Sequence, residues 1–333
     1  MRLKRPLKLK TSGEDVKFLQ SKLKEFGFFT EKIDGFFGQN LLVSVTNFQR
    51  KLNLKVDGIV GPQTWSNLLH YNPNPEPVLL KVERPVDIVH SVSYIDNTGF
   101  KIYDHLLEDN EYVREETNKN TIWLHHTAGG SRPDWTISGW EKDYLKNSNG
   151  EPILDDSGNL QPLKVATSYV IGRKSSSTGE TLWDGKVLRT FDDKYWAWHL
   201  GISDQFSHQL NSRSISIEIC NYGPLTIGKD GRFYNYVNKP ISESDVVELE
   251  KEFRGYKYWE KYTDAQLEST RKLILYLQSK WSIEIEKGIY DEKWFEYNSE
   301  FFTLGGLRSH SQVRRDKYDI FPQKEMIQML NSI

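Results

Sequence analysis

The sequence is poor in the residues that build disulfides, cysteine-rich metal sites and membrane spans. Its 333 residues include one cysteine, Cys220, which excludes an internal disulfide and a multi-cysteine zinc knuckle. No apolar run approaches the roughly 20 residues that a membrane helix needs. The basic residues 1–10 are not followed by the apolar stretch of a secretory signal. The net charge of −2 gives no electrostatic reason to expect nucleic-acid binding.

Histidine is also scarce, with eight residues in the whole chain. A metal site in this protein must therefore combine a few imidazoles with carboxylates. Apolar and aromatic residues are plentiful, because 37% of the chain is hydrophobic and it contains 16 Phe, 17 Tyr and 10 Trp. This composition and length predict a soluble globular protein of about two domains.

The first 70 residues contain a short internal repeat. Residues 32–40 (KIDGFFGQN) and 55–63 (KVDGIVGPQ) share one pattern, and each copy is followed by apolar residues at helical spacing. A third apolar stripe precedes both copies, and Ser12 with Asp15 resembles a capping box at its start. We therefore expect a small all-α domain of three helices with Asp-Gly turns. The carboxylate pattern of an EF-hand is absent, which argues against calcium in these turns.

A proline- and asparagine-rich stretch, HYNPNPEPV, follows this region and breaks both helical and strand periodicity. We predict domains at residues 1–70 and 87–333, joined by a linker over 71–86. In the second domain, the stretches NTIWLHHT, ATSYVIGR and RSISIEIC predict strands, and TDAQLESTRKLILYLQSKW predicts a long helix. This pattern predicts an α/β domain with a central mixed β-sheet flanked by helices. The polar segment 147–162 is expected to be a surface hairpin or loop insertion.

Two adjacent histidines end one predicted strand, in the stretch TIWLHHTAGG. Side chains alternate across a strand, so only one of His125 and His126 can face a given site. His125 shares its face with Trp123 and Thr127. From this pattern alone, a structural histidine and a metal ligand both remain open.

A third histidine lies in an irregular segment near the C-terminus. His310 is followed by Lys317 and Asp319, and a basic, solvated loop is the simplest interpretation. A hydrolytic zinc site, however, needs about three protein ligands and one open position for water. An irregular loop allows His310 and Asp319 to approach the same ion.

The N-terminal region resembles a known wall-binding module. The stretches GEDVKFLQSKLKEFGFF, IDGFFG, VTNFQRKLNL and VDGIVGPQTWSNLL, within residues 9–69, are similar to the peptidoglycan-binding domain at the ends of many bacterial and phage cell-wall hydrolases. The resemblance implies that this domain targets the cell wall and takes no part in catalysis.

The second domain resembles the zinc-dependent N-acetylmuramoyl-L-alanine amidases, which include phage amidases, bacterial anhydromuropeptide amidases and animal peptidoglycan recognition proteins. Their first zinc ligand is the first histidine of a strand-borne HHTA-like motif, the second is a late histidine, and the third is a Cys or Asp two residues beyond a lysine. The resemblance therefore implies Zn²⁺ held by His125, His310 and Asp319, with Lys317 close by. The family usually continues Asp-Pro-Gly, whereas this chain reads Asp-Ile-Phe-Pro at 319–322.

One stretch resembles the substrate groove of the family. YWAWHLG is similar to its aWHaG segment, which places Trp198 and His199 along the groove. We assign Asn211 and Thr127 to the same substrate-binding set. His126, in contrast, is expected to pack behind its strand and to tolerate substitution better than its neighbour.

Another stretch, NSRSISIEICNYG, resembles a strand whose glutamate is a catalytic base in some members. Alternation puts Glu218 opposite the isoleucine face, and an unpaired glutamate is costly to bury in an apolar core. The resemblance therefore implies that Glu218 is the catalytic base. Some phage members carry a catalytic tyrosine where this chain has Thr167, so no catalytic role is carried over to Tyr169.

The implied activity is hydrolysis of the amide bond between the lactyl group of N-acetylmuramic acid and L-alanine, by a zinc-activated water. Glu218 would move the proton, and Lys317 would stabilise the oxyanion. We expect bacterial peptidoglycan as the partner, no nucleic acid, no membrane insertion and a monomer. Because no signal peptide is recognised, we expect a phage endolysin or a virion-associated lysin that is made in the cytoplasm and acts at the cell wall.

Three alternatives belong to other functional classes. A recognition protein of the same fold could bind peptidoglycan without cleaving it, although the presence of all three implied ligands favours catalysis. A structural virion component could carry the same module. A different zinc peptidase could cut within the stem peptide, and only the motif pattern favours the amidase over it.

Overall fold

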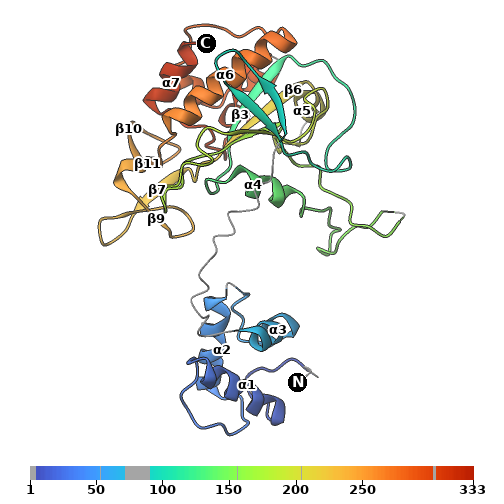
Figure 1. Cartoon of the computed structure of the whole chain (residues 1–333), viewed down its shortest axis with the longest axis vertical. Coiled ribbons are helices and arrows are strands. Elements are labelled where there is room, and N and C mark those ends of the chain that lie inside the picture. Colours follow the sequence, from blue (N-terminus) through green and yellow to red (C-terminus); the bar gives the residue numbers. More distant parts are fainter. Residues whose placement is uncertain (1–4, 53, 72–90, 156, 204, 303–304) are drawn as a thin grey trace. The chain divides into compact units, whose positions relative to one another are not determined.

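The computed structural model describes residues 5–333 except 53, 72–90, 156, 204 and 303–304 (Figure 1). The chain divides into two compact units, Met1–Ile88 and Val89–Ile333. From residue 72 onward, the predicted linker lies outside the described residues. Among the helices that are described, none has both the length and the apolar character needed to cross a membrane.

The N-terminal unit is helical, as predicted, and its helices pack around an apolar core (Figure 1). Val16, Leu19 and Leu23 give α1 its buried stripe at helical spacing. Pro62 occupies the first turn of α3, where its missing N–H costs no helical hydrogen bond. Each fully buried aliphatic or aromatic side chain in such a core stabilises the unit by about 1.5–3 kcal/mol. The helices are α1 (Glu14–Glu25), α2 (Gln39–Lys51) and α3 (Pro62–His70).

The internal repeat forms two turns of the same design. In each turn a buried glutamine from the preceding helix binds the aspartate: Gln20 Nε2 lies 2.7 Å from Asp34 Oδ1, and Gln49 Nε2 lies 3.1 Å from Asp57 Oδ1. The Oε1 atom of each glutamine accepts the N–H of the glycine that follows the aspartate, at 2.8 and 2.9 Å. Those glycines have φ values of 76° and 69°, which explains why glycine stands there.

The second unit is built on a seven-stranded sheet, and the prediction of an α/β domain with a mixed sheet is confirmed. Strands β4, β6, β3 and β12 run parallel to one another, and β2 runs parallel to β5, whereas β5 is antiparallel to β4 and β1 is antiparallel to β2. In spatial order the strands are β1 (Val92–Ile95), β2 (Lys101–Asp104), β5 (Val187–Arg189), β4 (Tyr169–Ile171), β6 (Ser214–Ile219), β3 (Thr121–His126) and β12 (Gly306–Ser309).

Two helices, α6 (Asp264–Trp281) and α7 (Lys324–Asn331), lie side by side against the sheet (Figure 1). Their apolar residues belong to one large core with Leu124 of β3 and Ile217 of β6. A capping box starts α6, because the Thr263 hydroxyl accepts the Gln266 N–H at 3.1 Å. The long helix that was predicted from the sequence is therefore present.

Smaller elements cover the other side of the sheet. Trp123 of β3 is fully buried there, in a cluster with Leu200, Leu210 and Val313. A second cluster includes Ile137 of helix α4. These two clusters leave the carboxyl ends of the central strands to the polar residues described below. The remaining helical segments of this unit are α4 (Pro133–Trp140), α5 (Ser207–Ser212), η1 (Glu243–Asp245), η2 (Glu292–Phe295), η3 (Ser299–Phe302) and η4 (His310–Gln312).

A second sheet, not anticipated from the sequence, is inserted between β6 and α6. All of its strand pairs are antiparallel. The polar segment 147–162 is a separate feature, in which isolated bridges pair Tyr144 with Pro162 and Leu154 with Leu160. In spatial order the inserted strands are β10 (Val246–Phe253), β11 (Tyr256–Glu260), β7 (Pro224–Ile227), β8 (Phe233–Tyr234) and β9 (Pro240–Ile241).

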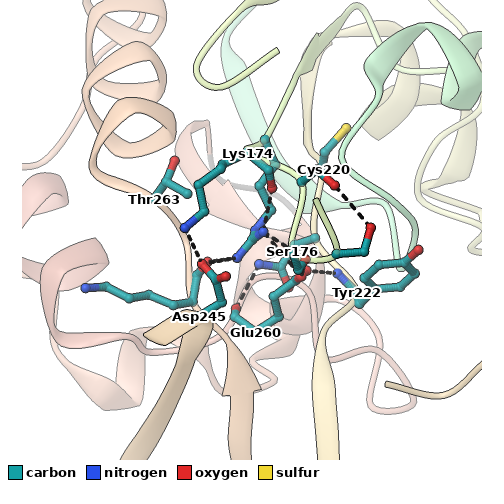
Figure 2. A network of polar contacts seen from close by, with 12 residues as sticks. Lys174, Ser176, Cys220, Tyr222, Asp245, Glu260 and Thr263 are labelled. Carbon is teal, nitrogen blue, oxygen red and sulfur yellow. Dashed lines mark hydrogen bonds and ion pairs between the residues drawn. The ribbon is translucent and has the colours of Figure 1, made fainter. Parts of the chain in front are cut away.

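A buried ionic network connects the inserted sheet to the main one. Arg173, two residues beyond the end of β4, is 1% exposed and lies 3.4 Å from carboxylate oxygens of both Asp245 and Glu260. Figure 2 shows these two carboxylates facing Lys174 and Ser176, and Lys174 Nζ lies 2.9 Å from Asp245 Oδ1. Removing one partner from a buried ionic network costs about 3–5 kcal/mol. The network therefore fixes the insertion relative to β4.

Candidate active site

The candidate site lies at the carboxyl ends of three adjacent parallel strands. His125 of β3 pairs in register with Glu218 of β6, so the two side chains project from the same face of the sheet. The neighbouring strand β12 ends at Ser309 and delivers His310 directly after it. In open α/β sheets, the carboxyl ends of strands are where ligands bind.

Three side chains from distant parts of the sequence converge here. The Nδ1 atoms of His125 and His310 lie 3.0 Å apart, and Asp319 Oδ2 lies 2.9 Å from His310 Nδ1 and 3.4 Å from His125 Nδ1. All three residues are buried, and within the described residues they form a group whose donor atoms could hold a metal ion. Zinc bonds of about 2.0–2.1 Å in a tetrahedron separate neighbouring ligand atoms by about 3.3 Å. The observed triangle is therefore close to the size that zinc requires.

The hydrogen bonding of His310 tests whether a cation fits. His310 Nε2 lies 2.9 Å from the carbonyl oxygen of Leu200, and a carbonyl can only accept, so Nε2 carries the hydrogen. In the tautomer that carries its one hydrogen on Nε2, His310 points the lone pair of Nδ1 at the carboxylate of Asp319, 2.9 Å away. These two groups repel each other unless a positive charge lies between them. The residues therefore fit a metal ion.

Burial controls the protonation of these groups. Desolvation, with a smaller effect of the nearby His310, lowers the pKa of His125 to about 4, although the contact with Asp319 opposes the shift. Burial alone would raise the pKa of Asp319, but its contacts with the imidazoles of His310 and His125 hold the pKa well below its usual value. At neutral pH the site therefore offers a neutral imidazole at His125 and a carboxylate, the forms that bind metal.

Glu218 lies next to this cluster and has a different electrostatic environment. Burial raises the pKa of Glu218 to about 8, and the negative charge of Asp319 adds to this effect. The positive charge of Lys317 lowers the Glu218 pKa, which places the lysine within electrostatic reach of the carboxyl group. A carboxyl group shifted toward neutral pH is suited to exchanging protons with a substrate.

Two of the residues assigned to the substrate groove, Thr127 and Trp198, contact loop and aromatic residues near the candidate site. The Thr127 hydroxyl accepts the N–H groups of Gly129 and Asn221, at 3.1 and 3.2 Å, so it closes the loop that follows β3. Trp198 is half-buried and packs edge-on against Trp196, with ring centroids 4.9 Å apart. Of this pair, Trp198 keeps the more accessible surface.

The other two assigned residues lie deeper than expected. Asn211 is 1% exposed, and its amide is bonded to the backbone of His199, Leu200 and Ser207. His199 lies 3.1 Å from His125, measured between His199 Nδ1 and His125 Nε2. The structure therefore buries Asn211, whereas His199 is half-buried and contacts His125 directly.

His126 and Tyr169 face the opposite side of the sheet. His126 is 5% exposed, and its Nδ1 lies 3.0 Å from the hydroxyl of Tyr262. Its ring is surrounded by aromatic side chains, and Tyr169 bonds Asp193 at 3.0 Å within the large core. His126 therefore packs behind the strand, as predicted, but as a core residue and not on a tolerant surface.

One contact was missed by the sequence reasoning. Tyr236, in the turn between β8 and β9 of the inserted sheet, is 64% exposed, and its hydroxyl donates to the carbonyl of Ala128 at 2.6 Å. Ala128 follows the paired histidines by two residues. No periodicity or motif marks Tyr236, because the contact joins segments more than 100 residues apart.

Known proteins share the sequence features of both units. A family model described as peptidoglycan binding domain matches residues 12–68, and one described as N-acetylmuramoyl-L-alanine amidase matches residues 116–320. A spore cortex-lytic enzyme of Bacillus cereus is 53% identical over 53 residues, which are 16% of this chain and 20% of the relative. One of Oceanobacillus iheyensis is 29% identical over 159 residues, which are 47% of this chain and 42% of the relative.

These curated relatives are thus matched over less than half of their own length. Among solved structures, the N-acetylmuramoyl-L-alanine amidase LysC from Clostridium intestinale is 16% identical, with a TM-score of 0.34 over 69% of this chain and 97% of that chain. The amidase model, in contrast, spans more than half of this chain. On that match, the chain belongs to the N-acetylmuramoyl-L-alanine amidase family.

Proposed function

We propose that this protein is a zinc-dependent peptidoglycan hydrolase that cleaves the amide bond between the lactyl group of N-acetylmuramic acid and L-alanine. The observation that carries the proposal is the buried triangle of His125, His310 and Asp319, with donor atoms 2.9–3.4 Å apart. Membership of the amidase family supports the choice of bond.

The residues of this chain have separable tasks in the proposed reaction. His125, His310 and Asp319 would hold zinc, which supplies Lewis acidity that lowers the pKa of water and polarises a carbonyl. Glu218 projects from the same face as His125, where it takes the proton of the attacking water and passes it to the leaving amine of L-alanine. The ammonium group of Lys317 stabilises the negative charge that develops on the scissile carbonyl oxygen.

The geometry favours catalysis over recognition alone. A protein that only binds peptidoglycan needs neither three converging ligands nor a carboxyl group whose pKa burial raises to about 8. Both features are costly, because buried ionisable groups must be desolvated. A catalytic function explains both features, because the three ligands would hold zinc and the carboxyl group would carry the proton.

The N-terminal unit is proposed to bind peptidoglycan, on the strength of the matching family model over residues 12–68. We propose a phage endolysin or a virion-associated lysin as the setting, in which a monomer acts at the bacterial cell wall. Deleting residues 1–70 should weaken binding to purified sacculi, while cleavage of small soluble muropeptides stays within about twofold. Equal loss of both activities would contradict this division of labour.

Product analysis tests the bond that is cut. Purified protein is incubated with sacculi, and the products are identified by mass spectrometry alongside elemental analysis of the protein for zinc. Free glycan strands together with intact stem peptides that begin at L-alanine are expected. Stem peptides cut internally would instead identify a peptidase, and intact sacculi in the presence of bound zinc would identify a recognition protein.

A further inference from the structure

The proton positions on the site histidines follow from their outer hydrogen bonds. The Ser214 hydroxyl donates its single hydrogen to the carbonyl oxygen of Asn211, at 3.1 Å. Ser214 Oγ can therefore only accept from His199 Nε2, which lies 2.8 Å away. His199 thus carries its hydrogen on Nε2 and presents a lone pair on Nδ1.

That lone pair meets the first histidine of the candidate site. His199 Nδ1 lies 3.1 Å from His125 Nε2, and the two rings are nearly perpendicular at 87°. His125 therefore donates its Nε2 hydrogen to His199 and turns a bare Nδ1 toward Asp319. His310 reaches the same state through the neighbouring residue, because its Nε2 donates to the carbonyl of Leu200.

Two consecutive residues, His199 and Leu200, thus each hold one histidine of the site. Their backbone is fixed by Asn211, whose Oδ1 accepts the N–H of His199 at 2.9 Å and of Leu200 at 3.2 Å. The Asn211 Nδ2 group donates to the Ser207 carbonyl at 2.7 Å. The buried amide of Asn211 therefore holds the backbone of residues 199–200 in place.

We propose that His199 is a positioning residue of the metal centre, and that the segment 199–200, clamped by Asn211, sets the tautomer and ring orientation of both His125 and His310. Outer hydrogen bonds of this kind orient metal-binding imidazoles and raise their basicity. The inference rests on the proposed zinc site. It replaces the substrate contacts expected from the sequence for His199 and Asn211.

A direct substrate contact by His199 is disfavoured by the same hydrogen bonds. Its Nδ1 accepts from His125 and its Nε2 donates to Ser214, so neither ring nitrogen is left to bind a substrate. Asn211, at 1% exposure, offers no surface either. Both side chains are therefore committed to the protein itself.

A pair of substitutions separates positioning from packing. In His199→Asn, the amide Oδ1 occupies nearly the place of the ring Nδ1 and can still accept from His125. In His199→Gln, the amide reaches the place of the ring Nε2 instead, so the acceptor for His125 is lost. We expect the zinc dissociation constant, measured by chelator competition, to stay near the wild-type value in His199→Asn and to rise about 10–100-fold in His199→Gln.

Controls make each outcome decisive. His208→Asn places the same substitution at a histidine whose side chain is 64% exposed, and thermal unfolding of each zinc-free variant reports packing. Equal weakening of zinc binding in both His199 variants, or no weakening in either, would overturn the proposal. So would unchanged zinc affinity with a raised KM, since that identifies a substrate contact. If the wild-type protein binds no zinc, the proposed function fails together with this inference.

Discussion

The two faces of β3 place adjacent histidines in opposite roles. His125 and His126 are both buried, at 2% and 5% exposure, and burial lowers the pKa of each to about 4. His125 points its Nδ1 at a second imidazole and a carboxylate, whereas His126 bonds one phenol, Tyr262, among aromatic rings. Burial and pKa do not distinguish a ligand from a core residue. The chemistry of the facing groups does.

Loss of a ligand on the site face should have the largest effect. His125→Ala and Asp319→Ala each leave two ligands, too few to hold a catalytic zinc ion. We expect peptidoglycan cleavage to fall by more than about 100-fold, beyond the cost of losing an outer contact, and bound zinc to be lost. A full complement of zinc by elemental analysis in either variant would refute the ligand assignment.

Substitution of Glu218 tests whether proton transfer and metal binding depend on different residues of the site face. Glu218→Gln keeps the shape of the side chain but cannot accept a proton. We expect zinc content to be unchanged and kcat to fall by about 10²–10⁴-fold, the contribution typical of a general acid–base group. Turnover close to that of the wild type would remove Glu218 from the mechanism.

On the core face, His126→Ala should reverse the pattern seen with His125→Ala. The substitution leaves a cavity among aromatic rings and an unpartnered Tyr262 hydroxyl, so the free energy of unfolding should fall by about 2–3 kcal/mol. Zinc content per folded molecule should stay near one. The comparison between the faces breaks down if His126→Ala loses zinc while urea unfolding shows unchanged stability.

The pH dependence of stability gives the smallest expected effect. The pKa of His126 is lowered to about 4 in the folded protein, against about 6.5 for an unfolded histidine. The unfolded chain therefore binds more protons than the folded protein between these pH values. The contribution of His126 to the free energy of unfolding is complete above pH 6.5 and is lost as the pH falls toward 4. In His126→Phe, the free energy of unfolding of the zinc-free protein, measured with urea, should fall less steeply between pH 6.5 and pH 4 than it does in the wild type. An unchanged slope would mean that His126 is not buried in its neutral form.

Local sequence patterns predicted those parts of the fold that depend on nearby residues. The repeated Asp-Gly turns, the helical stripe of α1 and the long helix α6 all arise from residues close in the sequence. The capping box expected from Ser12 and Asp15 was wrong, because Gly13 is the N-cap of α1 and no side chain caps the helix there. The inserted sheet was missed because three of its strands, β7, β8 and β9, are short and its attachment depends on the buried Arg173 network. Such distant ion pairs leave no periodic signal.

In the candidate site, too, some features could be predicted from local sequence and others depend on contacts between distant residues. Motifs pointed to the two histidines and the aspartate of the candidate site, and strand alternation separated His125 from His126. The role proposed for His199 and Asn211 differs from the substrate contact expected from the sequence, since a motif reports which residues are near a site but not which atoms they face. Their hydrogen bonds to His125 and to residues 199–200 exist only once β3, β6 and the 195–201 segment pack together.

The sequence by itself determined the two units, the mixed α/β architecture and the family, because periodicity and motifs are written in local order. Tertiary structure decided which nitrogen of each histidine faces Asp319. Hydrogen bonds that Leu200 accepts from His310 and His199 accepts from His125 impose that choice between residues 110 and 74 positions apart in the sequence. Contacts of a few ångströms between distant segments can only be set by folding, and in this protein they prepare the candidate metal site.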